Sequence, residues 1–368
     1  MRLRLVGACI CTAVSALLTA GAAAASTIVV HPGESIQAAI DGASPGDTIV
    51  VEPGTYHENL TVSKDNLTLT TSGGPGSVLL VPGDHPTPSP CNGGRRSING
   101  ICVIGLPQAG QSADARVRGT RIDGFTVDGF SGFGVALLKA SDATISHTVA
   151  LNNGGYGISG FVLSKVSFIA NVAHDNGEPG FYIGDSPNAR AMVVDNQAYR
   201  NGVGGPEGIG FLFRDSSNGI VRNNRASQNC AGYVFVDSGE NPAPLVNWTA
   251  TGNYGLQNNG ACVGEHRGTP PLSGIGFLLF GSSQVTLSGN VAKGNVPSGT
   301  TVASGGIILA SSASGGGADP TDNVIRGNVA LNNEPFDVLW DGSGTGNVFQ
   351  SNSCRTSQPP DICAGSTS

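Results

Sequence analysis

The stretch Gly180-Phe-Tyr-Ile-Gly-Asp-Ser186, with Asn171-Val-Ala-His-Asp-Asn176 before it, decides the fold of this chain of 368 residues. The first stretch opens with glycine and continues with a short apolar segment. The second stretch has asparagine at both of its ends. The opening recurs at Gly134, Gly157, Gly180, Gly210, Gly232, Gly276 and Gly306. The closing recurs at Asn171–Asn176, Asn196–Asn201, Asn224–Asn229, Asn253–Asn258, Asn290–Asn295 and Asn328–Asn333. Where uninterrupted, the period is 22 or 23 residues, which indicates a solenoid.

Each repeat predicts short strands separated by turns. Alternation of apolar residues favours strands over helices, and glycine, asparagine and serine mark the turns. We therefore expect an all-β, single-stranded, right-handed parallel β-helix. Successive coils would lie about 4.8 Å apart, so equivalent residues would form ladders along the axis. We expect the repeated asparagines to form two such ladders and to serve the structure, not catalysis.

The two ends and the insertions complete this architecture. Ser35–Ala43 predicts a short helix that covers the first coil, with Ile36 and Ile40 on one face. Longer spacings between repeats predict inserted loops, which often build the binding face of a solenoid. These loops lie at Val203–Glu207 and near Gly239–Val246, Gly260–Ser273 and Val296–Ser304.

The first 25 residues have the pattern of a secretory signal peptide, with arginines, an apolar stretch and a small-residue end. We therefore expect a secreted, extracellular protein with one β-helix domain over residues 26–368 and no membrane attachment after cleavage. A net charge of −7 leaves no basic footprint for nucleic acid and disfavours a polyanionic substrate unless a local basic groove exists. We expect a monomer.

Six cysteines remain after the predicted cleavage, which suits disulfides in an exported chain. Cys91 with Cys102, and Cys354 with Cys363, enclose short segments. Cys230 and Cys262 follow the second asparagine ladder on adjacent coils, within bridging reach. We therefore predict these three pairs.

The segment Val29–Thr71 contains Ser35-Ile-Gln-Ala-Ala-Ile, Pro45-Gly-Asp-Thr-Ile-Val-Val and Pro53-Gly-Thr-Tyr-His-Glu58. It resembles the amino-terminal coils of the pectate-lyase-like superfamily, and the later coils resemble β-helix repeats of secreted bacterial proteins. The resemblance implies the fold across the mature chain. The active-site motifs of pectinesterases, polygalacturonases, pectate lyases and mannuronan epimerases are missing, so no catalytic residue is carried over.

Side chains alternate along a strand, so the first and third residues after each repeat glycine should fill the core. The second residue should face outward, which gives an apolar row. Either inserted loops cover this row, or it is a groove for a partly apolar ligand with Tyr182 as a stacking platform. The row comprises Ala136, Ser159, Tyr182, Leu212, Val234, Leu278 and Ile308.

One acidic column follows the repeated strand at Asp185, Asp215 and Asp237, and Arg214 lies beside Asp215. We consider these four residues as a catalytic group, because stacked carboxylates raise one another's pKa, as a general acid requires. Neighbouring members at about 5 Å would suit a retaining glycosidase, and the outer two at about 9.6 Å an inverting one. Alternatively, Asp185 and Asp215 bind Ca²⁺, or each aspartate forms its own turn.

Four further residues are candidates for substrate binding: Tyr182, Glu178, Glu207 and Lys139. The glutamates precede two of the repeated strands, and Lys139 shares the acidic column. The leading hypothesis is a secreted carbohydrate-active enzyme, a polysaccharide lyase, hydrolase or epimerase, with no cofactor or with Ca²⁺. The alternatives are a non-catalytic extracellular or cell-envelope binding protein, and an enzyme for a smaller, partly apolar substrate.

Overall fold

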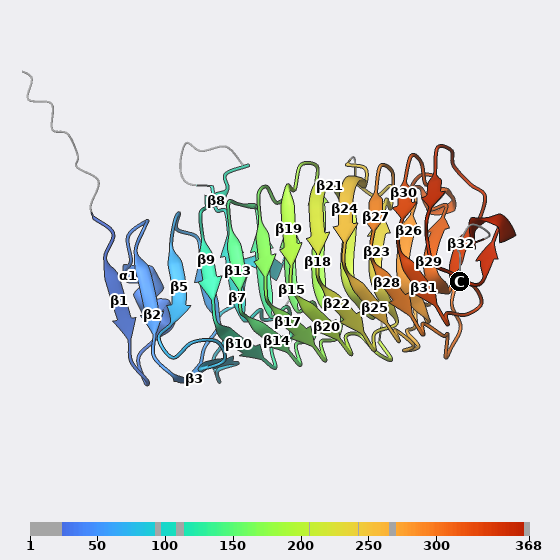
Figure 1. Cartoon of the computed structure of the whole chain (residues 1–368). Coiled ribbons are helices and arrows are strands. Elements are labelled where there is room, and N and C mark those ends of the chain that lie inside the picture. Colours follow the sequence, from blue (N-terminus) through green and yellow to red (C-terminus); the bar gives the residue numbers. More distant parts are fainter. Residues whose placement is uncertain are drawn as a thin grey trace, which may run out of the picture.

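The computed structural model describes residues 24–92, 97–107, 114–205, 207–241, 243–264 and 270–363. Most of the predicted signal peptide, residues 1–23, lies outside these described residues. The chain winds into one elongated right-handed β-helix whose parallel strands stack along a single axis (Figure 1). This confirms the fold class that the repeat predicts.

Three parallel sheets, which we call A, B and C, run along the solenoid. Each coil passes from sheet C to sheet A and then to sheet B. Sheet A contains β1 (Thr27–Val30), β2 (Thr48–Val51), β5 (Thr68–Thr71), β9 (Arg121–Asp123), β13 (Thr144–Ser146), β16 (Ser167–Ile169), β19 (Ala191–Val194), β24 (Val246–Thr251), β27 (Thr286–Ser288), β30 (Val324–Arg326) and β33 (Val348–Gln350).

The other two sheets are built in the same way. Sheet B contains β3 (Gly54–His57), β6 (Val78–Val81), β10 (Phe125–Asp128), β14 (Val149–Leu151), β17 (Val172–His174), β20 (Gln197–Tyr199), β22 (Arg225–Ser227), β25 (Tyr254–Leu256), β28 (Val291–Lys293) and β31 (Val329–Leu331). Sheet C contains β4 (Leu60–Val62), β7 (Ile101–Ile104), β11 (Val135–Leu138), β15 (Ile158–Phe161), β18 (Phe181–Ser186), β23 (Ala231–Val236), β26 (Ile275–Phe280), β29 (Gly305–Ala310), β32 (Val338–Trp340) and β34 (Ser357–Gln358). The long strand β21 (Ile209–Arg222) bends from sheet C into sheet A.

Short elements close the ends and corners. Helix α1 (Ile36–Gly42) lies at the amino-terminal end, where Ser35 caps it and Ile36 and Ile40 join the core (Figure 1). This confirms the predicted capping helix. A small pair, β8 (Val117–Arg118) and β12 (Ala140–Ser141), lies at the corner between sheets C and A. Within the described residues, three 3-10 turns complete the list: η1 (Pro90–Asn92), η2 (Ala313–Gly315) and η3 (Pro360–Cys363). No helix in the described part of the chain is long and apolar enough to cross a membrane.

The interior contains the core that the repeat predicts. The first and third residues after the glycines are buried, and aromatic rings stack between coils, with Phe211 and Tyr233 at 4.9 Å and 4°. Both asparagine ladders form. In each, a side-chain amide donates to the next asparagine and to a backbone carbonyl of an earlier coil, as Asn176 does to Asn201 and Ala150.

All three predicted disulfides are confirmed. Their Cα atoms lie 5.8 Å apart in Cys91–Cys102, 6.0 Å in Cys230–Cys262 and 5.4 Å in Cys354–Cys363. Cys230–Cys262 fixes the inserted segment after Gly260 against sheet C. It therefore helps to position what lies over the outer face of that sheet.

Candidate functional site

The apolar outer row of sheet C is buried. Leu212, Val234 and Leu278 are at most 5% exposed, and they form a second apolar cluster with Cys262 and Leu272 of the inserted segment. Over these coils the row is therefore covered by an inserted loop and is not an open groove for a ligand. Tyr182 itself is only 4% exposed, so it supports its neighbours and presents no free ring face.

An aromatic platform lies beside this row, on the coils of β11, β15 and β18. We give this name to the half-buried Phe133, Tyr156 and Phe161, with Tyr182 beneath them. Tyr156 stacks on Tyr182 at 4.8 Å and on Phe133 at 4.9 Å, and Phe161 lies 4.9 Å from Tyr182. Partly exposed aromatic rings in this number suit the apolar faces of sugar rings.

The acidic column borders the platform where the chain leaves sheet C. The strand register places Asp185 beside Asp215, and Asp215 beside Asp237, on three successive coils. Asp185 and Asp215 have positive φ angles of 53° and 46°, a conformation in which aspartate is among the tolerated residues. The backbone corner thus explains why aspartate recurs here, as the turn reading expects.

Asp215 has no exposed surface, and its carboxylate is fully engaged. The Ser238 backbone N–H donates to it at 2.8 Å and the Ser238 hydroxyl at 2.6 Å. Asn241 donates at 3.2 Å, and the Arg214 guanidinium lies 3.5 Å away. Asp215 therefore holds the loop that begins at Ser238, and it can act on a ligand only through these neighbours.

Asp185 and Asp237 remain partly exposed on either side of Asp215. Burial raises the pKa of Asp185, and the charge of Asp215 adds to this while Arg214 opposes it. Asp185 accepts a hydrogen bond from Asn241 at 2.6 Å. Burial also raises the pKa of Asp237, which accepts from the Gly239 backbone N–H at 3.1 Å. Asp185 can therefore stay protonated at pH values where an ordinary carboxyl group is ionised.

Arg214 is the cation at the centre of this group. Its side chain is 25% exposed, donates to the Ser238 hydroxyl at 3.2 Å and forms an ion pair with Glu240. Tyr182 reaches the same place from the platform. A Cβ atom added at Gly184 would lie 1.9 Å from the Tyr182 hydroxyl oxygen, so the glycine makes room for this ring. Burial raises the pKa of Tyr182, so its hydroxyl stays protonated.

Of the remaining predicted residues, the two glutamates come before the strands that lead to the acidic column, and Lys139 lies in the column itself. Glu178 and Glu207 are half-buried just before β18 and β21, and the charge of Glu207 acts on both Tyr182 and Arg214. Lys139 shares the column but is separated from Asp185 by Val162. In the described ranges, no three side chains of His, Cys, Asp or Glu converge to hold a metal ion. Calcium binding stays a prediction.

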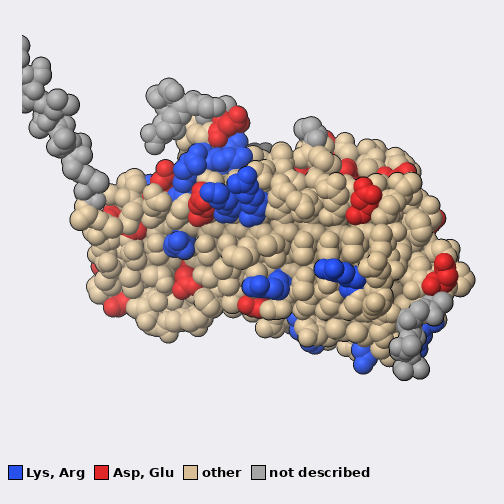
Figure 2. Space-filling view, turned by 45° about the horizontal axis from the view of Figure 1, so that its top comes forward, with Lys and Arg blue, Asp and Glu red and all other residues tan. Residues whose placement is uncertain are grey.

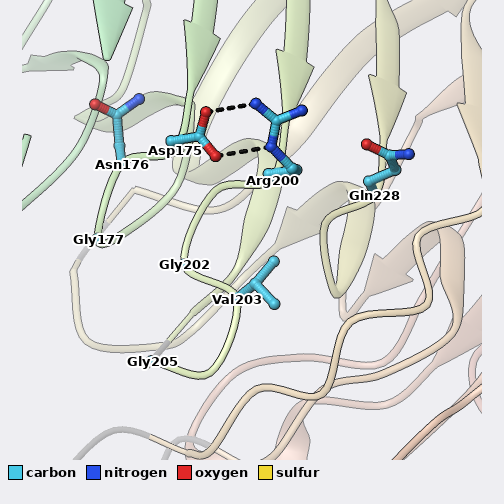
Figure 3. A pocket seen from close by; sticks show the side chains of 8 residues that line it. All are labelled: Asp175, Asn176, Gly177, Arg200, Gly202, Val203, Gly205 and Gln228. Carbon is cyan, nitrogen blue, oxygen red and sulfur yellow. Dashed lines mark hydrogen bonds and ion pairs between the residues drawn. The ribbon is translucent and has the colours of Figure 1, made fainter. Parts of the chain in front are cut away.

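The structure contains a second polar cluster that was not predicted from the sequence. Asp175 accepts two hydrogen bonds from Arg200, at 2.8 and 2.6 Å (Figure 3). His174 Nδ1 also lies 2.6 Å from the Asp175 carboxylate. His174 stacks on Tyr199 at 4.6 Å. The cluster borders a surface cavity of about 660 Å³ floored by Gly177, Gly202 and Gly205. Asp175 and Arg200 each precede the last asparagine of a closing stretch, Asn176 and Asn201, and this shared position on successive coils could have revealed the pair.

The Asp175–Arg200 pair predicts a pH-dependent contribution to stability. The hydrogen bonds from Arg200 lower the pKa of Asp175, so the pair stabilises the fold while the carboxylate is ionised. Arg200→Ala should therefore cost about 0.5–1 kcal/mol near neutral pH, since the pair is partly exposed. The difference from wild type should shrink as the pH falls through the lowered pKa of Asp175, because the protonated carboxyl no longer pairs with Arg200.

Urea unfolding across this pH range measures the effect. Arg225→Ala, at an exposed position on the next coil, serves as the matched control and should be near neutral at every pH. A deficit of Arg200→Ala that stays constant down to acid pH would show that the ion pair is not its cause.

Comparison with known proteins agrees with the observed architecture. A family model described as "Right handed beta helix region" matches residues 108–270. No curated protein matches the chain. Among solved structures, the mannuronan C-5 epimerase AlgE6 A-module of Azotobacter vinelandii is similar with a TM-score of 0.57 and 19% identity, over 88% of this chain and 83% of the epimerase module.

Two further solved structures have a similar fold. The Dettilon tailspike protein gives a TM-score of 0.55 and 17% identity, over 88% of this chain and 66% of the tailspike. An alginate lyase from Paenibacillus sp. FPU-7 gives 0.54 and 15%, over 87% of this chain and 99% of the lyase. These likenesses confirm the fold that the resemblance to the pectate-lyase-like superfamily implies.

Proposed function

We propose that this right-handed parallel β-helix protein is a secreted carbohydrate-active enzyme that hydrolyses a glycosidic bond beside the aromatic platform. The observation that carries the proposal is Asp185, a carboxyl with a raised pKa next to Arg214 and the platform. The epimerase and lyase among the similar structures act on polysaccharides by their names, which supports a carbohydrate as the ligand. Three disulfides support export.

The burial of Asp215 supports one of the two geometries for the proposed hydrolysis. It removes the adjacent pair at about 5 Å that a retaining glycosidase needs, because a buried carboxylate cannot attack a sugar. Asp185 and Asp237 remain, two coils apart, at roughly 9.6 Å from the coil spacing. This separation is near the upper limit for an inverting hydrolase. Asp185 would protonate the leaving oxygen, and Asp237 would activate a water on the other side.

Arg214 and Asp215 then have positioning roles. Asp215 holds Ser238 and Asn241, and Asn241 in turn holds Asp185, so the buried carboxylate fixes the direction of the acid. Arg214 balances the negative charge of this group. Aspartates outnumber the single arginine here, so the reacting sugar unit is better accepted when it carries no charge.

The test compares Asp185→Asn with wild type on a panel of neutral and acidic polysaccharides, with and without Ca²⁺. We expect Asp185→Asn to lower the release of reducing ends by about a hundredfold, the scale of general acid catalysis. Wild-type turnover should fall as the pH rises through the raised pKa of Asp185, because only the protonated acid acts. Asp195→Asn, at an exposed corner with φ of 59°, is the matched control and should keep full activity.

Stability separates a chemical effect from a structural one. The fold disfavours the ionised form of Asp185, since its pKa is raised. Asp185→Asn should therefore leave the free energy of unfolding near neutral pH unchanged or higher. Full activity in Asp185→Asn refutes its role as the acid. Products with an unsaturated sugar end would refute hydrolysis and indicate a lyase.

A second candidate function is non-catalytic binding of a glycan. It is favoured by the hydrogen bonds that already occupy Asp185, Asp215 and Asp237, each of which supports the loop from Ser238 to Asn241. In that case the wild type would bind a polysaccharide of the panel without releasing product. Truncation of the platform residue Phe161 to alanine would then weaken binding, whereas Asp185→Asn would leave it unchanged.

A further inference from the structure

Basic side chains gather at the corner between sheets C and A, near β8 and β9, although the chain carries a net charge of −7 (Figure 2). A hollow of about 410 Å³ lies there, and Arg116, Arg118 and Lys165 are among the residues that line it. We call these three residues, with the exposed Arg121 and Arg190 beside them, the basic hollow. It holds five of the 19 lysines and arginines of the chain, so charge is concentrated here.

The coil repeat places Arg118, Lys165 and Arg190 along one corner of the solenoid, with Asp142 on the coil between Arg118 and Lys165. Arg118 pairs in register with Ser141, and Ser141 with Ser164, so Lys165 lies two coils on and one residue past the position of Arg118. The next coil adds Arg190, because the Lys165 backbone N–H donates to Ala189 at 2.6 Å. These positions span three coil steps, about 14 Å.

Acidic neighbours do not cancel this charge. Asp142 lies 3.4 Å from Lys165, and the carboxylate of Asp65 accepts from the backbone of Arg118. Neither Arg118 nor Arg121 forms an ion pair with any residue in the described ranges. Two exposed guanidinium groups with no acidic partner there, together with Lys165 and Arg190, leave the hollow ready to attract an anion.

The shape of the hollow indicates the kind of anion. Cations along one narrow corner fit a single extended chain, whereas a duplex would present two phosphate backbones. Leu163 and Pro187 are the apolar lining residues. Among the residues that the structure describes, no aromatic ring lines the hollow on which the bases of a single-stranded nucleic acid could stack. A polysaccharide with repeated anionic groups meets both conditions.

We propose that the basic hollow binds an anionic polysaccharide and anchors the protein on it. The hollow lies outside the aromatic platform, but Pro187 and Asn188 of its lining follow Asp185 by two and three residues. The hollow therefore lies close along the chain to the end of β18 that carries Asp185. Carboxylate and sulfate groups share the chemistry that the arginines recognise. The proposal does not depend on catalysis at Asp185.

The test measures binding of the full exported chain to immobilised polygalacturonate and dextran sulfate, with uncharged dextran and single-stranded DNA for comparison. We expect binding to one or both anionic glycans, weakening as salt is raised, and none to dextran. Binding to polygalacturonate alone would assign carboxylate as the anion, and binding to dextran sulfate alone would assign sulfate. The double change Arg118→Glu with Arg121→Glu should weaken the affinity at least about tenfold.

Controls separate this proposal from general charge effects and from the proposed function. Arg326→Glu makes a similar reversal at an exposed position of sheet A far along the axis and should change affinity less than about twofold. Asp185→Asn should bind the anionic glycans like wild type, whatever happens to turnover. Thermal unfolding checks that each variant folds, and Arg118→Gln with Arg121→Gln gives a milder second pair. Equal losses in Arg326→Glu, or tighter binding to DNA than to either glycan, would overturn the proposal.

Discussion

Replacing Asn224 by leucine should destabilise the protein by about 3–5 kcal/mol, because the change leaves several buried polar groups without partners. The Asn224 amide donates to the Val193 carbonyl at 2.8 Å and to Asn253 at 3.0 Å. Its oxygen accepts from both the backbone and the side chain of Asn196 at 2.9 Å. Each of these groups is inside the turn, where water cannot replace the lost bond.

The neighbouring Asn223 provides the matched control. It is exposed and has a φ of 55°, so Asn223→Gly keeps the backbone conformation and should cost less than about 1 kcal/mol. Urea unfolding measures both variants, and hydrogen exchange should locate the loss at the coils on either side of Asn224. An effect of Asn224→Leu no larger than that of Asn223→Gly would mean that the ladder contributes little to stability.

The sequence was sufficient to predict both ladders and the inward rows, for a physical reason. Neighbouring coils pair strand by strand, so residues one repeat apart become neighbours whatever their side chains are. Counting by one repeat also correctly predicted that Cys230 lies beside Cys262 and Asp185 beside Asp215. Contacts of this kind follow from the period alone, which is why the fold could be predicted in detail.

Contacts made by inserted loops do not follow from the period. Asn241 reaches Asp185 across 56 residues, and Leu272 packs over the outer row of sheet C. Neither loop has a length or composition that fixes its path, so the burial of Asp215 could not be predicted. The charge of the basic hollow was also hidden, because Arg118, Lys165 and Arg190 lie on different coils within an acidic chain.

Trp248→Ala should be the most destabilising single truncation of the core, at about 3–5 kcal/mol. Trp248 lies in β24 with no exposed surface, 4.5 Å from the ring of Phe213. Its indole N–H donates to the Ser216 carbonyl at 2.9 Å, so truncation leaves a cavity and an unpaired acceptor. Thr249→Ala, at the exposed position that follows, is the control and should cost less than about 1 kcal/mol.

Gly219 makes room for this ring, and a double-mutant cycle tests the fit. A Cβ atom added at Gly219 would lie 2.1 Å from a ring carbon of Trp248, so Gly219→Ala should cost about 1–3 kcal/mol by overpacking. With Trp248→Ala already present, the added methyl group enters empty space, and the same change should cost almost nothing. Urea unfolding of the four proteins should therefore give a coupling energy of about 1–3 kcal/mol. Additive effects would instead show that Gly219 is required for its backbone and not for the ring it faces.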